Sequence, residues 1–221
     1  VANPIPDEIL ASVGCTDRSF ESQTAVMVLN GWDAWKNGAA ALRAFAAARR
    51  TRPGLRLVCF GWHWEQGGVA QTWAQRQGLA DGVEFRGAVP HATILEQMQA
   101  STVLLHPSRL EACCMTIAEA MSVALPVIGG RSTSGVSWQL DGGKAGLLVD
   151  VMDEDAMAAA LVELTADRTR WTALSRAGRE RAGEIFACRH VTNQYVKQYA
   201  MAIDAAARAP DVRGKKAVSA E

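Results

Sequence analysis

Residues 102–130 read TVLLHPSRLEACCMTIAEAMSVALPVIGG and contain an apolar run, a polar loop, a helical pattern and a second apolar run. The runs at residues 102–106 and 126–129 have the length and β-rich composition of buried strands. Between them, residues 115–124 place Ile117 and Met121 on one helical face. A strand, a helix and a strand in this order predict two parallel strands joined by a right-handed crossover.

The same alternation continues toward both ends of the chain. It adds strand-like runs and helical patterns in turn, at residues 25–29, 36–50, 55–60, 69–77, 83–85, 93–99, 146–149 and 154–165. The sequence therefore predicts an α/β fold with a doubly wound, mostly parallel, Rossmann-like sheet. Two further helical stretches, residues 168–186 and 190–207, follow the last strand. We expect them to wrap the domain or to reach toward a partner.

The predicted domain covers residues 1–207. After it, Pro210, Gly214, two lysines and small residues lack any period, so residues 208–221 are predicted to be a disordered tail. A chain of 221 residues with 49% hydrophobic content can bury a core without further stapling. One domain with an appendage is the expected organisation.

Composition narrows the possible partners. The 23 lysines and arginines balance the 23 aspartates and glutamates, so no net field attracts nucleic acid or an anionic membrane. Five cysteines without a CxxC pair do not suggest a disulfide framework, which favours a reducing, cytoplasmic setting. No apolar run approaches the roughly 18 to 20 residues of a membrane span, and no signal peptide is recognisable. The chain begins with Val1, which indicates a fragment or a processed product.

Glu111 and Glu119 are the most informative candidate site residues. Their spacing puts one carboxylate in the loop after a strand and the other a turn or two into the next helix, at the sheet edge where ligands collect. Glu119 can accept two hydrogen bonds from the vicinal hydroxyls of a ribose. Unpaired amides at the helix start form a phosphate site, contributed by Cys113, Cys114, Met115 and Thr116. As bare residues, Glu119 can equally compensate the helix dipole and Glu111 can be a solvated loop acid.

Other loops leave the same ends of the predicted strands. Lys36, near a helix start, suits a phosphate, although a solvated surface lysine is the alternative. Gly61 opens a glycine-rich turn that lets backbone approach a ligand, or that simply reverses the chain. The backbone of Gly87, Ala88 and Val89 can face the edge of a base, but nothing in the sequence requires it.

The motifs resemble a known family when they are taken together. HPSRLE at residues 106–111, EAMSVALPVIGG at 119–130 and DGGKAGLLV at 141–149 resemble the donor-binding half of a retaining glycosyltransferase of the GT-B fold. That half belongs to the large group-1 family, which uses nucleotide sugars. Residues 1–5 resemble the segment that opens the family's C-terminal domain, and residues 191–199 resemble its closing helix. The resemblance covers nearly all of the chain except its tail.

The resemblance implies a role for each matching residue. Glu119 would bind the ribose hydroxyls, Glu111 would lie over the donor sugar, and Lys36 would neutralise the diphosphate together with the amides of residues 113–116. The remaining matches would frame the base and complete the phosphate side: Gly87 to Val89, and Ser134 with Gly135. Such enzymes release the nucleoside diphosphate without a metal. The resemblance therefore implies no cofactor.

Three features depart from the family pattern. Gly31 stands where the family carries an arginine, and Ala112-Cys113-Cys114 replaces Gly-aromatic-Gly. The two cysteines are expected to be small buried fillers, although thiol pKa values tend to fall near a helix start. The N-terminal half that would bind an acceptor saccharide or lipid has no room in this chain. We expect the donor-binding half of a glycosyltransferase, or alternatively a non-catalytic nucleotide-sugar-binding or interaction module.

Overall fold

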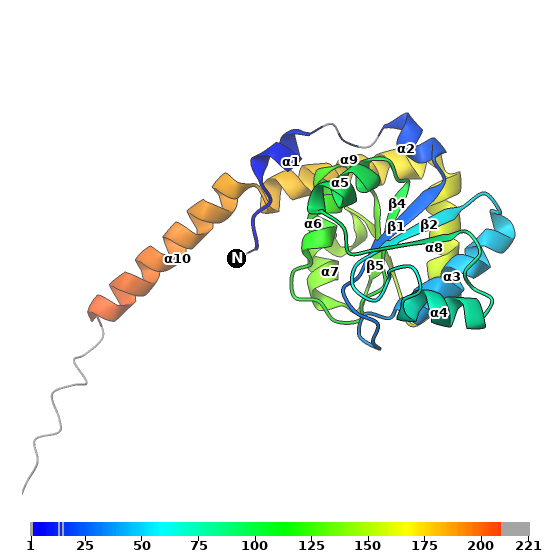
Figure 1. The fold of residues 1–221 in the computed structure, drawn as a ribbon. Coiled ribbons are helices and arrows are strands. Elements are labelled where there is room, and N and C mark those ends of the chain that lie inside the picture. Colours follow the sequence, from blue (N-terminus) through cyan, green and yellow to red (C-terminus); the bar gives the residue numbers. More distant parts are fainter. Residues whose placement is uncertain (1, 13, 15, 209–221) are drawn as a thin grey trace, which may run out of the picture.

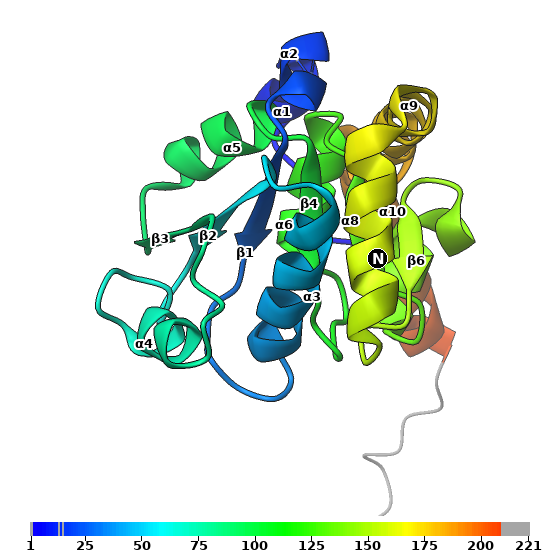
Figure 2. The same ribbon diagram turned by 90° about the vertical axis from the view of Figure 1, so that its right-hand side faces the viewer.

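The computed structural model describes residues 2–12, 14 and 16–208, which Figures 1 and 2 show from two directions. These residues form a six-stranded parallel sheet in the order β3-β2-β1-β4-β5-β6. Its strands are β1 (Thr24–Val28), β2 (Arg56–Phe60), β3 (Val83–Gly87), β4 (Val103–His106), β5 (Val127–Gly130) and β6 (Leu147–Val149). The predicted doubly wound α/β fold is confirmed.

Helices connect and follow the strands. All seven predicted helices are present, with ends shifted by at most two residues: α3 (Gly38–Thr51), α4 (Val69–Arg76), α5 (His91–Gln99), α6 (Met115–Ser122), α8 (Glu154–Ala166), α9 (Arg168–Ile185) and α10 (Cys188–Arg208). Four short elements were not predicted from the sequence: α1 (Asp7–Ala11), α2 (Asp17–Glu21), α7 (Ser134–Gln139) and the 3₁₀ turn η1 (Asp141–Gly143). Elements of three to six residues are too short to display a helical period.

Helices cover both faces of the sheet. Since alternate strand residues point to opposite faces, each strand contributes side chains to both cores. In β1, Ala25 and Met27 pack in a core formed with α3, α4 and α8, whereas Val26 packs in a second core with α5, α6 and α7. Figure 2 shows α3 and α8 side by side on the first face. Burial on both faces explains why the strands read as continuous apolar runs.

The two C-terminal helices behave differently. The indole of Trp171 on α9 donates to the Thr102 carbonyl at 2.7 Å, so α9 wraps the domain. In contrast, α10 extends away from the body of the domain, and Val191 is its buried residue (Figure 1). Arg208, assigned to the tail from sequence, is the last residue of α10, and the rest of the predicted tail lies outside the described residues. Within the described ranges, no helix has the length and apolarity needed to span a membrane.

Candidate functional site

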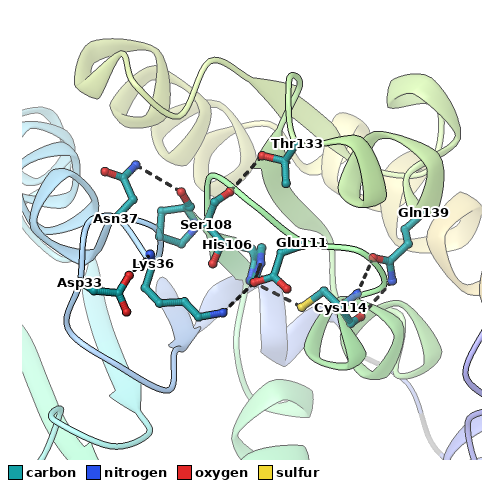
Figure 3. A network of polar contacts seen from close by, with 10 residues as sticks. Asp33, Lys36, Asn37, His106, Ser108, Glu111, Cys114, Thr133 and Gln139 are labelled. Atoms are coloured by element: carbon teal, nitrogen blue, oxygen red, sulfur yellow. Dashed lines mark hydrogen bonds and ion pairs between the residues drawn. The ribbon is translucent and has the colours of Figure 1, made fainter.

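The candidate site lies where the strand order reverses. From β1 the chain continues to β2 and β3 at one edge of the sheet, and from β4 it continues to β5 and β6 at the other edge. Because β1 and β4 are neighbours in the sheet, the loops that follow them diverge and leave a crevice. Lys36 follows β1 and Glu111 follows β4. The Lys36 ammonium Nζ lies 2.9 Å from Glu111 Oε1, and the two side chains are 30% and 16% exposed (Figure 3). The structure therefore brings together the two residues predicted to be catalytic.

The loop after β1 is held by its own polar side chains. Asp33 Oδ1 accepts hydrogen bonds from the amides of Trp35 and Lys36 at 2.8 and 3.0 Å. Lys36 lies in this turn and not in the helix, which begins at Gly38. Asn37 Nδ2 donates to the carbonyls of Pro107 at 3.2 Å and Val151 at 2.7 Å. One side chain thus connects the β1 loop to the β4 loop and to the loop after β6.

The Glu111 loop is held from the opposite side by α7. The Gly135 amide donates to the Glu111 carbonyl at 3.2 Å, and Thr133 Oγ1 donates to the Ser108 carbonyl at 3.0 Å. A β-carbon on Gly135 would lie 2.2 Å from the Ala112 carbonyl oxygen, so only glycine permits this approach. Gly135 therefore positions the Glu111 loop, while Ser134 is exposed at the start of α7.

Glu111 also lies over a buried histidine. His106 Nε2 is 3.5 Å from Glu111 Oε1, which is too long for a strong hydrogen bond, so the contact is mainly electrostatic. This contact, followed by the Lys36 ammonium, lowers the pKa of Glu111 to about 2, although burial opposes the shift. Glu111 is an anion at neutral pH, held between two cationic partners.

The start of α6 differs from the prediction. The Cys114 amide was expected to be unpaired, but it donates to Gln139 Oε1 at 2.9 Å, and Gln139 Nε2 donates back to the Cys114 carbonyl at 2.9 Å. The prediction is wrong for this amide because a buried side chain from α7 already satisfies it. Cys113, Met115 and Thr116 remain at the helix start as candidate phosphate contacts.

Replacing Gln139 with alanine is expected to destabilise the fold. Gln139 is fully buried, and its loss leaves one buried amide and one buried carbonyl without their partner. Each unsatisfied group costs about 1 to 3 kcal/mol, so the free energy of unfolding should fall by about 3 kcal/mol. Urea denaturation measures this loss. The neighbouring Ser137→Ala should change stability by less than about 0.5 kcal/mol; equal effects of the two substitutions would contradict the assigned role.

Glu119 faces a different part of the crevice. Its Oε1 lies 2.9 Å from Nε2 of His91, at the start of α5, while Glu111 is turned toward Lys36. Its side chain is 14% exposed, and burial raises its pKa although the contact with His91 opposes this. The two predicted carboxylates are thus engaged by separate partners, one on the β1 side and one on the β3 side.

Gly61, predicted to let backbone approach a ligand, and Gly87, predicted to face a base, make backbone hydrogen bonds within the protein. The Gly61 amide donates to the Gly87 carbonyl at 2.8 Å, and the Gly87 amide donates to the Trp64 carbonyl at 3.0 Å. Gly61 has φ of 114°, and a β-carbon there would lie 2.0 Å from the Leu29 carbonyl oxygen. Close packing against Leu29 requires a glycine at 61, and the approach of its backbone to a ligand stays a prediction. Ala88 and Val89 remain the candidates for facing a base.

Four positioning residues were missed or left without a role by sequence reasoning: Asn37, His91, His106 and Gln139. Asn37, His91 and Gln139 act across long sequence separations, so no local spacing signals their partners. His106 instead contacts Glu111 and Cys114, which follow it in the loop after β4. His106, Glu111 and Cys114 also form the one group found within the described ranges whose side chains could together hold a metal ion, with ligand atoms within 4.8 Å of one another. The sequence motifs gave no sign of this cluster.

Comparisons with known proteins agree with this architecture. The chain is 29% identical over 173 residues, which is 76% of this chain and 38% of the relative, to a D-inositol 3-phosphate glycosyltransferase of Segniliparus rotundus. A crystal structure of HepE from Anabaena in complex with UDP and glucose has a TM-score of 0.73 at 18% identity, covering 90% of this chain and 55% of that chain.

A second solved structure matches as a single domain. The C-terminal domain of a group 1 glycosyl transferase, LpcC of Francisella tularensis, has a TM-score of 0.68 at 14% identity, covering 83% of this chain and 99% of that chain. This chain therefore fits the C-terminal half of a GT-B fold, and it spans well under half of its curated relative. Residues 18–181 match the family described as glycosyl transferases group 1. The chain belongs to the glycosyl transferases group 1 family.

Proposed function

We propose that this chain is the donor-binding half of a retaining glycosyltransferase that uses a nucleotide-diphosphate sugar. The observation that carries the proposal is the 2.9 Å pair of Lys36 and Glu111 at the point where the strand order reverses. A lysine and a carboxylate in such a crevice suit this reaction, because the lysine can contact the departing diphosphate and the carboxylate can face the sugar.

In this proposal each residue contacts a different part of the nucleotide-sugar donor. Lys36 neutralises the negative charge that develops on the leaving diphosphate, and Glu111 lies over the reacting carbon of the sugar. Glu119 accepts the ribose hydroxyls, and the backbone at Ala88 and Val89 faces the base. The ammonium does the charge-stabilising work, so the proposed reaction needs no metal. The UDP in the structurally similar HepE complex supports a nucleoside diphosphate as the ligand.

The acceptor would be bound by a further domain. The chain covers 38% of the relative from Segniliparus rotundus. We therefore assign binding of the acceptor, a saccharide or a lipid, to a region outside this domain. We place the protein in the cytoplasm, and the free thiols of Cys59, Cys113, Cys114 and Cys188 agree with a reducing setting.

A non-catalytic donor-binding module is the second candidate, and one observation favours it. Gly31, which replaces the family's arginine, has φ of 125°, a conformation that side-chain-bearing residues rarely adopt. A β-carbon there would lie 3.0 Å from Asp33 Oδ2. The loop thus presents an acid near the position of the missing cation, which would weaken stabilisation of the diphosphate.

Calorimetric titration with UDP, GDP, ADP and their common sugar conjugates tests the proposal. We expect saturable binding of one base, with the sugar conjugate and the diphosphate competing for one site. Binding without transfer, after an acceptor domain from a relative is supplied, would favour the non-catalytic module. Absence of binding at millimolar ligand would contradict both candidates.

A further inference from the structure

A thiol, an imidazole and a carboxylate lie close together beside the Lys36 ammonium (Figure 3). Cys114 Sγ is 3.9 Å from His106 Nδ1, and His106 Nε2 is 3.5 Å from Glu111 Oε1. Cys114 is 7% exposed and His106 is 2% exposed. The imidazole therefore offers a different nitrogen to each neighbour, in a site from which bulk water is largely excluded.

This orientation favours a proton relay over a metal site. A metal such as zinc would bind a single imidazole nitrogen together with the sulfur and the carboxylate, at metal–ligand distances of about 2.0 to 2.3 Å, and one ligand atom from each of the three residues does lie within 4.8 Å of the others. Here the two nitrogens are divided between the two neighbours. A nucleophile beside a base that is itself oriented by a third group is instead the arrangement that activates thiols.

We infer that Cys114 is a reactive thiolate and a modification site for small hydroperoxides, with His106 as its proton partner and Glu111 as the group that orients His106. Cys114 is the N-cap of α6, where the helix dipole favours negative charge. Two features of the fold, the contact with His106 and the start of α6, thus favour the same anion.

The charges of the cluster agree with this inference. Burial alone would raise the pKa of Cys114, but the charge and the hydrogen bond of His106 lower it. Burial alone would lower the pKa of His106, but Cys114 and Glu111 raise it to about 9. Cys59, which is buried without such partners, has a pKa raised by burial. The two buried thiols therefore differ in reactivity for a local reason.

The proposed step is a two-electron oxidation of sulfur. The thiolate attacks one oxygen of the hydroperoxide, the O–O bond breaks, and the sulfur becomes a sulfenic acid. The leaving hydroxide, or the alkoxide of an organic hydroperoxide, takes the proton of the His106 imidazolium and departs as water or alcohol. The peroxide is the oxidant and is reduced, and a thiol such as dithiothreitol restores Cys114.

Oxidation would also act on the candidate donor site, and this consequence rests on the proposed function. The added oxygen lies between His106 and the start of α6, and it removes the positive charge that His106 presents to Glu111. Glu111 then draws more strongly on Lys36, which is the cation assigned to the diphosphate. We expect oxidised protein to bind the nucleoside diphosphate at least about tenfold more weakly.

Peroxide oxidation of the whole chain, followed by mass spectrometry, tests the inference. The protein is treated with hydrogen peroxide, denatured in an alkylating reagent, and the oxidised fraction of each cysteine is followed over time. We expect Cys114 to be oxidised at least about tenfold faster than Cys59 in the same molecules, because thiolate is the reactive form. Cys113→Ser should retain the fast phase, and Cys114→Ser should lose it.

A second variant separates activation from simple access. His106→Asn should slow the oxidation of Cys114 to near the rate of Cys59, with folding checked by circular dichroism. Equal rates for Cys114 and Cys59 in the wild-type protein would overturn the inference, whatever the variant does. The mass readout does not depend on nucleotide binding, so a protein that is oxidised at Cys114 but binds no nucleotide would contradict only the proposed function.

Discussion

Glu119→Ala is expected to raise the dissociation constant for the bound nucleotide by at least about 100-fold. A carboxylate that accepts two hydroxyl hydrogen bonds contributes about 1.5 to 3 kcal/mol for each bond, and alanine removes both. The side chain is 14% exposed, so water compensates little for the loss. Calorimetric titration of both proteins with the same nucleotide measures the change.

Two controls make the Glu119 experiment specific. Glu180→Ala removes a carboxylate of similar helical setting that is 68% exposed on α9, and it should leave the affinity unchanged. A 2′-deoxynucleotide already lacks one of the two hydroxyls, so the wild-type protein should bind it more weakly than the ribonucleotide. Glu119→Ala should therefore reduce the affinity for the deoxynucleotide by a smaller factor. If Glu119→Ala reduced the affinity for the ribonucleotide and the deoxynucleotide equally, the assignment of Glu119 to the ribose hydroxyls would be wrong.

Lys36→Ala should reduce the affinity for a nucleoside diphosphate by about 10- to 100-fold and the affinity for the corresponding nucleoside by less than about twofold. The ammonium is assigned to the phosphates, so a ligand without phosphates should not detect its loss. The substitution also leaves Glu111 without its 2.9 Å partner, and this anion then repels the diphosphate. Titration with both ligands gives the comparison.

The ion pair allows the two causes to be separated. In the double variant Lys36→Ala and Glu111→Gln, the repulsion is gone, so part of the lost affinity should return. Lys197→Ala on the exposed surface of α10 controls for a general loss of positive charge. Equal weakening of nucleoside and diphosphate would refute the role given to Lys36.

The fold was predictable because its signals are local. Strands buried on both faces read as apolar runs, and the helices between them carry a full apolar stripe, so all six strands and the seven longer helices were placed from sequence. The short helix α7 was missed because SGVSWQ contains one glycine, two serines and no periodic stripe. That helix is formed by contacts to the Glu111 loop, which are absent from the local sequence.

The site was predictable only in outline. The topology brings the loops after β1 and β4 together, which explains why Lys36 and Glu111 were expected in one crevice. The pairing of Gln139 with the Cys114 backbone, and of His91 with Glu119, depends on side-chain positions 25 and 28 residues apart in the chain. The amide of Cys114 was therefore assigned to a phosphate that it cannot reach while Gln139 holds it. The ligand roles of the remaining residues stay predictions.

Asn37 has a consequence for the thermodynamics of binding. Its side chain connects three loops before any ligand arrives, through the carbonyls of Pro107 and Val151. Loops that are already ordered lose little conformational entropy when they close around a ligand, and rigid sites keep more of their interaction energy as affinity. A donor entering this crevice therefore meets a preorganised wall, and the entropic penalty of association falls mainly on the flexible nucleotide sugar.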